Sequence, residues 1–112
     1  MITGDNTITS NTVTVNDIGI WVNSSYNDVF NNYFENTNNA VDSSTAGNRW
    51  NTTRIAGTNI IGGSWIGGNY WSDYTGVDTD GDGIGNTLVP YTAGGNIATG
   101  GDWLPLTTPS FA

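Results

Sequence analysis

The sequence predicts an all-β fold, a short parallel β-helix of about three coils, from its composition and from a repeat of 21 residues. Strong helix formers are scarce, since the chain has no Lys, one Glu and one Met among its 112 residues. Asn, Thr, Ser and Gly, which favour turns and short strands, are abundant instead. A coil of this length holds three short strands and three turns. Equivalent side chains of successive coils then lie above one another at the strand spacing of about 4.8 Å.

Asparagines carry the repeat, together with the apolar residues that stand two positions after them. The asparagines at 21-residue intervals are Asn6, Asn27, Asn48 and Asn69, and their apolar followers are Ile8, Val29, Trp50 and Trp71. We expect Asn6, Asn27 and Asn48 to form a hydrogen-bonded ladder in one turn. The expected interior columns are Ile8, Val29 and Trp50, then Val13, Phe34 and Ile55, then Ile20 and Val41. The alternative is an ordinary β-sandwich in which the asparagine spacing is a coincidence.

The repeat weakens after residue 57, which predicts two parts within one domain. Residues 1–57 are expected to form the coils, and residues 58–112 a Gly- and aromatic-rich C-terminal cap. The end of a β-helix exposes unpaired strand edges and apolar interior, so a cap is needed there. Asn69 and Trp71 either end the repeat or begin a different element. We expect the aromatic residues of the cap to form its core rather than a platform for sugars.

The cap contains the stretch DTDGDGIGN, in which three carboxylates stand two residues apart. It matches the start of the calcium-loop pattern D-x-[DN]-x-[DN]-G, with Gly83 at the sharp turn. The expected ligands are the side chains of Asp78, Asp80, Asp82 and Asn86 and the backbone carbonyl of Ile84. Val89 stands where such loops carry a bidentate Glu, so we expect Asp102, in preference to Asp73, to supply that ligand. The alternative is a solvated acidic turn without an ion.

Charge and residue types exclude several classes of function. The net charge is −8, and the only basic residues are Arg49 and Arg54. Binding to nucleic acid needs a basic face, so it is not expected. His and Cys are absent, which removes the usual ligands for zinc and copper. No run of about 18 apolar residues predicts a membrane span, and no signal peptide is visible. Asn23 and Asn51 stand in N-glycosylation sequons, which is compatible with an extracellular location.

The segment GNYWSDYTGVDTDGDGIGNTLVPY, followed by DWLPL, resembles the C-terminal part of NosD-like β-helix domains of the carbohydrate-binding and sugar-hydrolysis (CASH) type. These domains occur in archaeal cell-surface proteins, and NTITSNTV and NDVFNNYF resemble their Asn-rich coils. The resemblance implies a right-handed parallel β-helix, a surface or secreted location and an ion-binding acidic loop. It does not carry over the copper role of the member that gives the family its name, because this chain lacks copper ligands.

The favoured function is a calcium-stabilised structural element of the cell surface. Its uncovered N-terminal coil is expected either to stack end to end with copies of the chain, forming a filament, or to adjoin the remainder of a larger surface protein. The alternative is a non-catalytic carbohydrate-binding module, with glycans as partners. No enzymatic activity is expected, because the acidic residues of the coils do not recur at the repeat spacing. Asp17 and Asp42 are the pair considered for a catalytic site.

Overall fold

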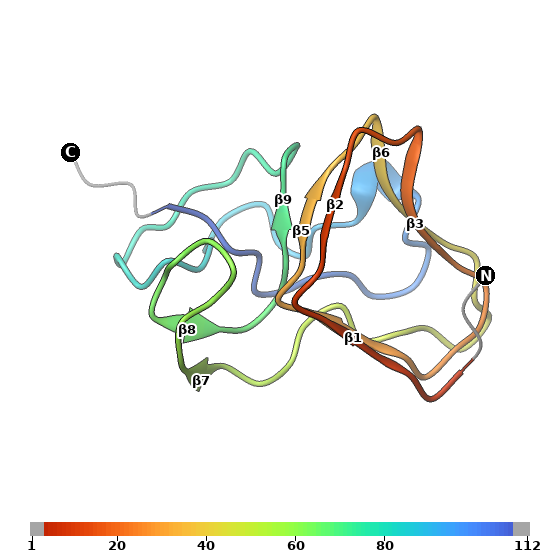
Figure 1. The fold of residues 1–112 in the computed structure, drawn as a ribbon, viewed down its shortest axis with the longest axis horizontal. Coiled ribbons are helices and arrows are strands. Elements are labelled where there is room, and N and C mark those ends of the chain that lie inside the picture. The colour runs from red at the N-terminus through yellow and green to blue at the C-terminus, as the bar shows by residue number, and fades with distance from the viewer. Residues whose placement is uncertain (1–3, 109–112) are drawn as a thin grey trace.

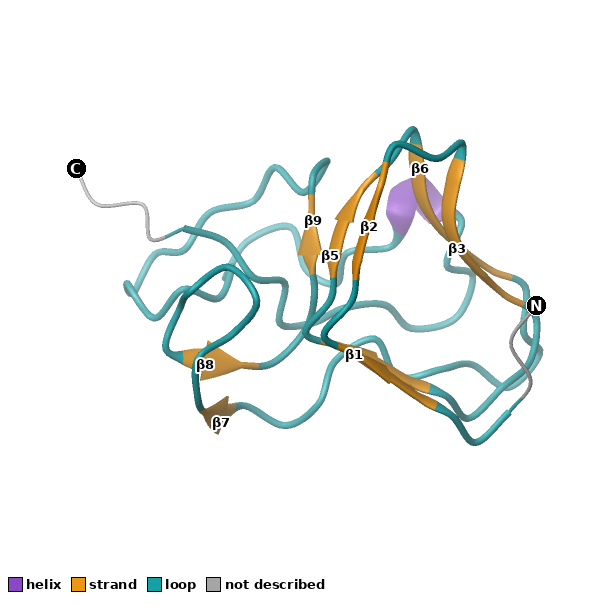
Figure 2. Cartoon of the chain, viewed as in Figure 1, coloured by secondary structure: helices purple, strands orange, loops and turns teal. Residues whose placement is uncertain are grey.

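The computed structural model describes residues 4–108, and these residues form short β-strands joined by turns and loops (Figure 2). The prediction of an all-β chain is confirmed, because the one helical element in this range is a 3-10 turn, η1 (Ala93–Gly95). The strands are β1 (Thr7–Thr9), β2 (Thr12–Thr14), β3 (Ile18–Val22), β4 (Asp28–Phe30), β5 (Tyr33–Glu35), β6 (Asn38–Asp42), β7 (Ile55–Ala56), β8 (Trp65–Ile66) and β9 (Tyr70–Trp71).

The first six strands form two layers that follow the same path through space. Strand β1 pairs in parallel with β4, β2 with β5, and β3 with β6. Residues 6–26 form the first layer and residues 27–47 the second, and the two turns of chain run closely alongside each other in Figure 1. Ile8 lies opposite Val29, and Val13 lies opposite Phe34, so apolar side chains stack as expected on these two faces.

The third layer is interrupted. Asp28 bridges to Arg49, so Trp50 follows Val29 in the first column, and Trp50 is fully buried. The chain then leaves the layer and forms the antiparallel hairpin of β7 and β8. It returns at β9, which pairs in parallel with β5 and places Trp71 next to Phe34. Strands β2, β5 and β9 therefore lie side by side in Figure 1.

Two of the expected interior positions are wrong. Ile55 does not occupy the second column: it lies in the hairpin with 54% of its surface exposed, and Trp71 takes its place. Val41 does not stack on Ile20, because Ile20 lies opposite Ala40. The cause is Val15, an extra residue in the turn after β2 that has a positive φ and is 91% exposed. It changes the offset between layers on this face from 21 to 20 residues.

An aromatic column joins the layers to the C-terminal segment. The ring of Trp71 stacks on Phe34 at 4.8 Å and on Tyr91 at 4.2 Å between ring centroids. Trp50 lies tilted against Trp71 at 5.8 Å. The side chains of Trp50, Trp71 and Tyr91 are buried, whereas Trp103 is 54% exposed. Trp71 and Tyr91 thus continue the column of Val13 and Phe34 into the C-terminal segment.

Residues 96–106 cover the strand edges of the last layer. Asp42 bridges in parallel to Ile97, and Tyr70 bridges in parallel to Leu106. The backbone N–H of Gly68 donates to the carbonyl of Leu104, and that of Leu106 donates to the carbonyl of Asn69. These contacts close the end of the layers that lies away from β1. Strand β9 lies within residues 58–112 and belongs to the three-stranded sheet, so of the two alternatives for Asn69 and Trp71 they continue the layers.

Candidate functional site

The acidic loop brings together the three aspartates that the motif singled out. One carboxylate oxygen from each of Asp78, Asp80 and Asp82 lies within 4.8 Å of the others. This is the one group of three such side chains in residues 4–108 close enough to hold an ion. Carboxylate oxygens are the donors that hard cations prefer. The loop therefore gathers three oxygen donors of the kind that hard cations bind.

Asp78 organises the backbone of this loop. Its Oδ1 accepts the N–H groups of Asp80 and Gly81, at 3.2 and 2.8 Å, and its Oδ2 accepts the N–H of Gly83 at 2.8 Å. Gly81 and Gly83 have positive φ, which glycine adopts without steric cost. Burial acts to raise the pKa of Asp78, but the N–H bonds outweigh it, so that pKa lies below its ordinary value.

Asp80 is exposed, whereas Asp82 is half-buried. The hydrogen bond between Asp80 and Asp78 is the main cause of a raised pKa for Asp80. Asp82 is ion-paired with Arg54, whose Nη1 lies 2.7 Å from Oδ2. The guanidinium of Arg54 also lies over the ring of Trp65, 4.3 Å from its centroid. Arg54 thus links the β7–β8 hairpin to the acidic loop, and nothing in its sequence position signalled that role.

Ile84 and Asn86 lie beside the same loop. Both line a cavity of about 340 Å³ with Asp80 and Asp82. The side-chain oxygen of Asn86 accepts the N–H and hydroxyl of Thr79, at 2.9 and 3.1 Å. The side chain of Ile84 is buried, as expected for its position in the motif. The structure therefore places these two residues next to the carboxylates, with the amide of Asn86 holding the loop closed.

Asp102 does not lie among the acidic loop residues, which argues against its expected role as the replacement ligand. It is fully buried at the end of the aromatic column. Its Oδ2 accepts the backbone N–H of Asn69 and the indole N–H of Trp71, at 2.7 and 2.8 Å, and its Oδ1 accepts the N–H of Leu104. Burial raises the pKa of Asp102 to about 7, against the lowering effect of these bonds. Gly68 packs directly against this carboxylate.

Asparagines form three ladders that cross the layers. In the Asn6 ladder, Nδ2 of Asn6 donates to Oδ1 of Asn27 at 3.2 Å, and Nδ2 of Asn27 donates to Oδ1 of Asn48 at 2.9 Å. The Asn11 ladder runs through Asn11, Asn32 and Asn69, and the Asn16 ladder through Asn16, Asn36 and Asn39. Asn69 thus continues the Asn11 ladder, not the Asn6 ladder with which it shares the 21-residue spacing.

The two sequon asparagines differ in their surroundings. Asn23 is exposed. Asn51 is half-buried, and its Oδ1 accepts the backbone N–H of Trp103 at 3.0 Å. Its Nδ2 donates to the carbonyl of Thr52. A glycan at Asn51 would use the nitrogen that makes this bond, so Asn23 is the more accessible of the two.

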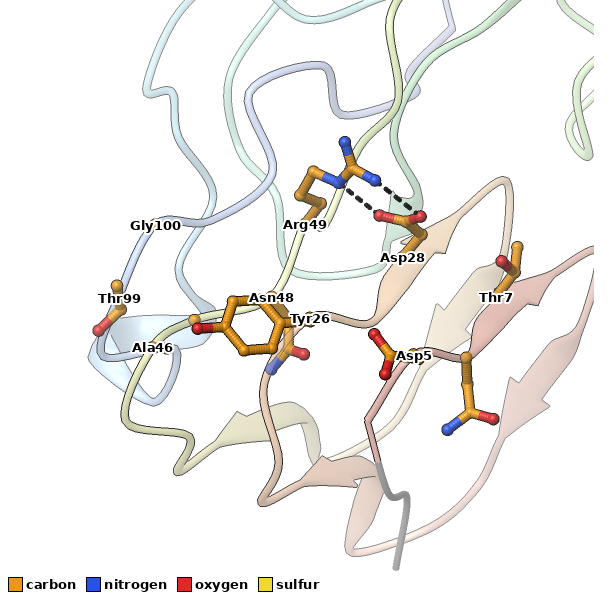
Figure 3. Close-up of a pocket in the computed structure, with 11 residues that line it drawn as sticks. Asp5, Thr7, Tyr26, Asp28, Ala46, Asn48, Arg49, Thr99 and Gly100 are labelled. Atoms are coloured by element: carbon orange, nitrogen blue, oxygen red, sulfur yellow. Dashed lines mark hydrogen bonds and ion pairs between the residues drawn. The ribbon is translucent and has the colours of Figure 1, made fainter.

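A polar groove runs beside the Asn6 ladder. A cavity of about 510 Å³ is lined by Asp5, Thr7, Tyr26, Asp28, Arg49 and Thr99, among others. Figure 3 shows the ring of Tyr26 on one side and the two-point pairing of Arg49 with Asp28 on the other. A second cavity of about 480 Å³ shares Asp28 and Arg49 and extends the groove to Trp103.

Tyr26 is a functional candidate that the sequence did not reveal. Its side chain is 70% exposed, and its φ of 68° is unusual for a bulky residue. The equivalent positions, each just before an asparagine of the Asn6 ladder, are Asp5 and Gly47, both also with positive φ. Asp and Gly are common in that conformation. The signal was therefore available in the repeat, as a tyrosine at a turn position that suits small residues.

The pair considered for catalysis is not brought together as a working site. Asp17 is exposed, whereas Asp42 is buried. Oδ2 of Asp42 accepts the Nδ2 of Asn48 and the indole N–H of Trp50, at 3.1 and 3.0 Å. Burial acts to raise the pKa of Asp42, but hydrogen bonds from Ser44, Asn48 and Trp50 lower it below its ordinary value. This carboxylate has a structural position at the end of the Asn6 ladder.

Comparison with family models identifies the class. The model described as "Periplasmic copper-binding protein (NosD)" matches residues 2–76, more than half of the chain. The protein therefore belongs to the NosD family. Comparison with curated proteins and with solved structures gave no match. No helix within the described range is long and apolar enough to cross a membrane.

The metal in the family's description does not fit the residues of this chain. The sequence has no His and no Cys and a single Met. Copper sites use imidazole, thiolate or thioether ligands, whereas carboxylate and carbonyl oxygens suit magnesium, calcium and manganese. The acidic cluster of the described residues is built of aspartates alone. We therefore derive no copper chemistry for this member of the family.

Proposed function

We propose that this chain is an extracellular or cell-surface structural element in which the parallel layers are coils of a short right-handed β-helix. The observation that carries the proposal is the in-register pairing of β1 with β4 and β2 with β5, linked by the asparagine ladders. Such an arrangement gives a stiff rod with repeated backbone bonds. The family's description as periplasmic supports a location outside the cytoplasm. No turnover forms part of this role.

Hydrogen exchange and enzymatic assays test the structural role together. We expect slow hydrogen exchange across β4 and β5 and no release of reducing ends from a panel of polysaccharides. Exchange of these strands as fast as in an unfolded chain would contradict the proposal. Turnover that is lost on replacing Asp28 in the groove, and kept on replacing Asp17, would show an enzyme instead.

The uncovered side of β1, β2 and β3 supports two forms of assembly. This side faces away from the cap, and no strand among residues 4–108 pairs with it. It can adjoin the remainder of a larger surface protein, or it can meet another copy of the chain. Both forms of assembly fit a structural role.

We propose that calcium stabilises the cap by binding Asp78, Asp80 and Asp82. The convergence of their oxygens supports this, and so does the chemistry of the donors. The carbonyl of Ile84 and the amide of Asn86 are the nearby groups that complete the proposed set, with water as the remaining ligand. Ion binding neutralises three carboxylates that otherwise repel one another. Its role is structural, since no general base or other catalytic partner is assigned to the loop.

Calorimetric titration tests the calcium site. We expect calcium uptake by the natural chain, a rise in its melting temperature, and weaker uptake by Asp80→Asn. Asp17→Asn is a matched control, because it removes one exposed charge away from the loop. No uptake at millimolar calcium with an unchanged melting temperature would refute the site. Equal weakening in both variants would show that only the net charge matters.

The groove favours a second candidate function, non-catalytic binding of a glycan. Exposed aromatic faces stack on the C–H faces of sugar rings, and planar polar side chains bond to hydroxyl groups. Tyr26 and Trp103 offer such faces at the two parts of the groove, with Asp28 and Arg49 shared between them. A glycan array followed by calorimetry tests this. Tyr26→Ala and Trp103→Ala should weaken binding, whereas Trp21→Ala, which changes an exposed aromatic outside the groove, should not. An array without hits would end this candidate.

A further inference from the structure

Two tyrosines lie stacked on the outer face of the three-stranded sheet. Tyr33 of β5 and Tyr70 of β9 are direct partners in the parallel register of these strands. Their ring centroids are 4.5 Å apart, and their planes differ by 11°. Each precedes a buried residue of the interior column, Phe34 or Trp71, so its side chain points to the opposite face of the sheet. Both tyrosines are half-buried, which leaves part of each ring accessible to solvent.

A carboxylate lies at the hydroxyl end of this stack. The hydroxyl of Tyr33 donates to Oε1 of Glu35 at 2.9 Å, and Glu35 itself is exposed. This bond is the main cause of a raised pKa for Tyr33, and the neighbouring Tyr70 adds to the increase. The two phenol groups therefore lie close together, and an acceptor for a phenolic proton lies beside one of them.

This arrangement favours one covalent reaction, the coupling of two tyrosyl radicals. A phenol that loses an electron and its proton becomes a radical, whose unpaired electron lies in the π system. Part of that electron density lies at the ring carbons ortho to the oxygen. The π orbitals of stacked rings point toward each other, so a bond between two such carbons forms directly across the gap. Tyr33 and Tyr70 are the one stacked pair of tyrosines among residues 4–108.

We propose that Tyr33 and Tyr70 are a site of oxidative cross-linking, at which a dityrosine bond joins β5 to β9. The oxidant is a peroxide used by an external haem peroxidase. Each phenol gives up one electron and one proton, and the proton of Tyr33 passes to Glu35 while that of Tyr70 passes to water. The radicals form one carbon–carbon bond, and each bonded carbon then loses its hydrogen as a proton while a phenol oxygen regains one. The peroxide takes up the two electrons and two protons and leaves as two molecules of water.

The bond stabilises the point where the chain returns to the layers. Residues 34–69, which include the β7–β8 hairpin, lie between the two tyrosines. A covalent link across this segment restricts the unfolded chain, as a disulfide does. The chain has no Cys, so a disulfide cannot take this part. The use of the link rests on the location proposed above, outside the cytoplasm, where the environment is oxidising. Its formation depends neither on calcium nor on a glycan.

Oxidation followed by trypsin digestion tests the site in the full chain. Arg49 and Arg54 are the only basic residues, and both lie between Tyr33 and Tyr70 in the sequence. Trypsin therefore separates the two tyrosines of the denatured chain unless a covalent bond joins them. We expect monomer treated with hydrogen peroxide and a haem peroxidase to give the N-terminal and C-terminal fragments as one linked species. Its mass should be lower by two hydrogen atoms than the sum of the two fragments.

Substitutions that keep the aromatic ring assign the link to its residues. Tyr33→Phe and Tyr70→Phe should each lose the linked species, because Phe retains the stacked ring and lacks the hydroxyl. Tyr26→Phe is the matched control and should keep it. Tyr26 lies in the same tryptic fragment as Tyr33 and is 70% exposed, but it stacks on no other tyrosine in the part of the chain that the structure describes. Glu35→Gln should slow the reaction, because it removes the proton acceptor.

Each part of the inference has a result that would overturn it. No linked species from the natural chain, or one that Tyr33→Phe keeps, would overturn the cross-link. Together with slow hydrogen exchange in β5, that result overturns the cross-link alone, whereas fast exchange there would show that the proposed structural role fails as well. A linked monomer should have a higher thermal midpoint than untreated protein, and an unchanged midpoint would contradict the stabilising effect. An unchanged rate in Glu35→Gln would exclude Glu35 as the proton acceptor.

Discussion

The layered half of the molecule and its cap are stabilised in different ways. In the layers, the same contacts recur: parallel backbone pairs, apolar columns and asparagine ladders repeat from one layer to the next. In the cap, each contact occurs once, as with the fit of Gly68 against Asp102 or the bonds of Asp78 to its loop. Repetition spreads the stabilising free energy over many equivalent residues, whereas the cap depends on single residues. The two regions should therefore respond differently to substitution, pH and metal.

The largest expected effect comes from Gly68, where the chain rejoins the layers. A Cβ at this position would lie 1.9 Å from Oδ1 of the buried Asp102. Gly68→Ala must displace either the carboxylate or β9, so we expect it to cost about 4 kcal/mol or more of unfolding free energy. Gly57→Ala is the matched control, because its Cβ meets only the flexible end of Ile66, at 3.1 Å. Chemical denaturation measures the unfolding free energy of both variants. Equal stability of the two would contradict the close packing of Gly68 against Asp102.

The next largest effect is on the pH dependence of stability, to which the buried aspartates Asp102 and Asp42 contribute with opposite signs. The folded pKa of Asp102 is raised to about 7, so its unfolded form loses a proton first, and stability falls as the pH rises from about 4 to about 7. The slope reaches at most about 1.4 kcal/mol per pH unit. The pKa of Asp42 is lowered, so its contribution is present above about pH 4 and is lost as the pH falls.

Denaturation across this range of pH, with Asp102→Asn as the comparison, measures the contribution of the cap aspartate. Asn does not ionise, so the decrease between about pH 4 and 7 should become smaller in the variant. An identical pH profile in the variant and the natural chain would mean that another group causes the decrease. A steeper decrease in the variant would contradict the raised pKa.

A smaller loss is expected within the ladders. Asn27 is fully buried in the middle of the Asn6 ladder, accepts two bonds from Asn6 and donates two to Asn48. Asn27→Ala leaves buried polar groups without partners, which costs about 2–3 kcal/mol. Asn16→Ala, at the exposed end of its ladder, should cost less than about 1 kcal/mol. If the two variants lose the same unfolding free energy, the contribution of a ladder asparagine does not depend on its burial, which would contradict our account.

The sequence predicted what repeats and not what occurs once. The columns of Ile8 with Val29 and of Val13 with Phe34 follow from the spacing, since equal intervals place equivalent side chains together. The exit of the chain after Trp50 was hidden because Ile55 and Asn69 happen to match the interval. The shift of the third face by Val15 was also hidden, because one extra turn residue has no equivalent in the next layer and leaves no periodic mark.

The candidate site shows the same division. The local motif predicted the grouping of Asp78, Asp80 and Asp82, because two-residue spacing with a glycine turn points side chains into one loop. Asp102 was assigned to that loop from its place in the chain, and it lies instead at the end of the Asn11 ladder. Arg54 reaches the loop from the β7–β8 hairpin. Both positions depend on long-range packing that no local pattern encodes.

Hydrogen exchange with and without calcium tests the central claim most directly, because it compares the two regions in one experiment. We expect calcium to slow exchange in residues 76–87 of the cap and to leave β4 and β5 unchanged, since those strands are stabilised by parallel pairing. Asp78→Asn should abolish the change in the cap. Exchange that is unaffected by calcium throughout the chain, or β4 and β5 that exchange freely in both conditions, would contradict the account.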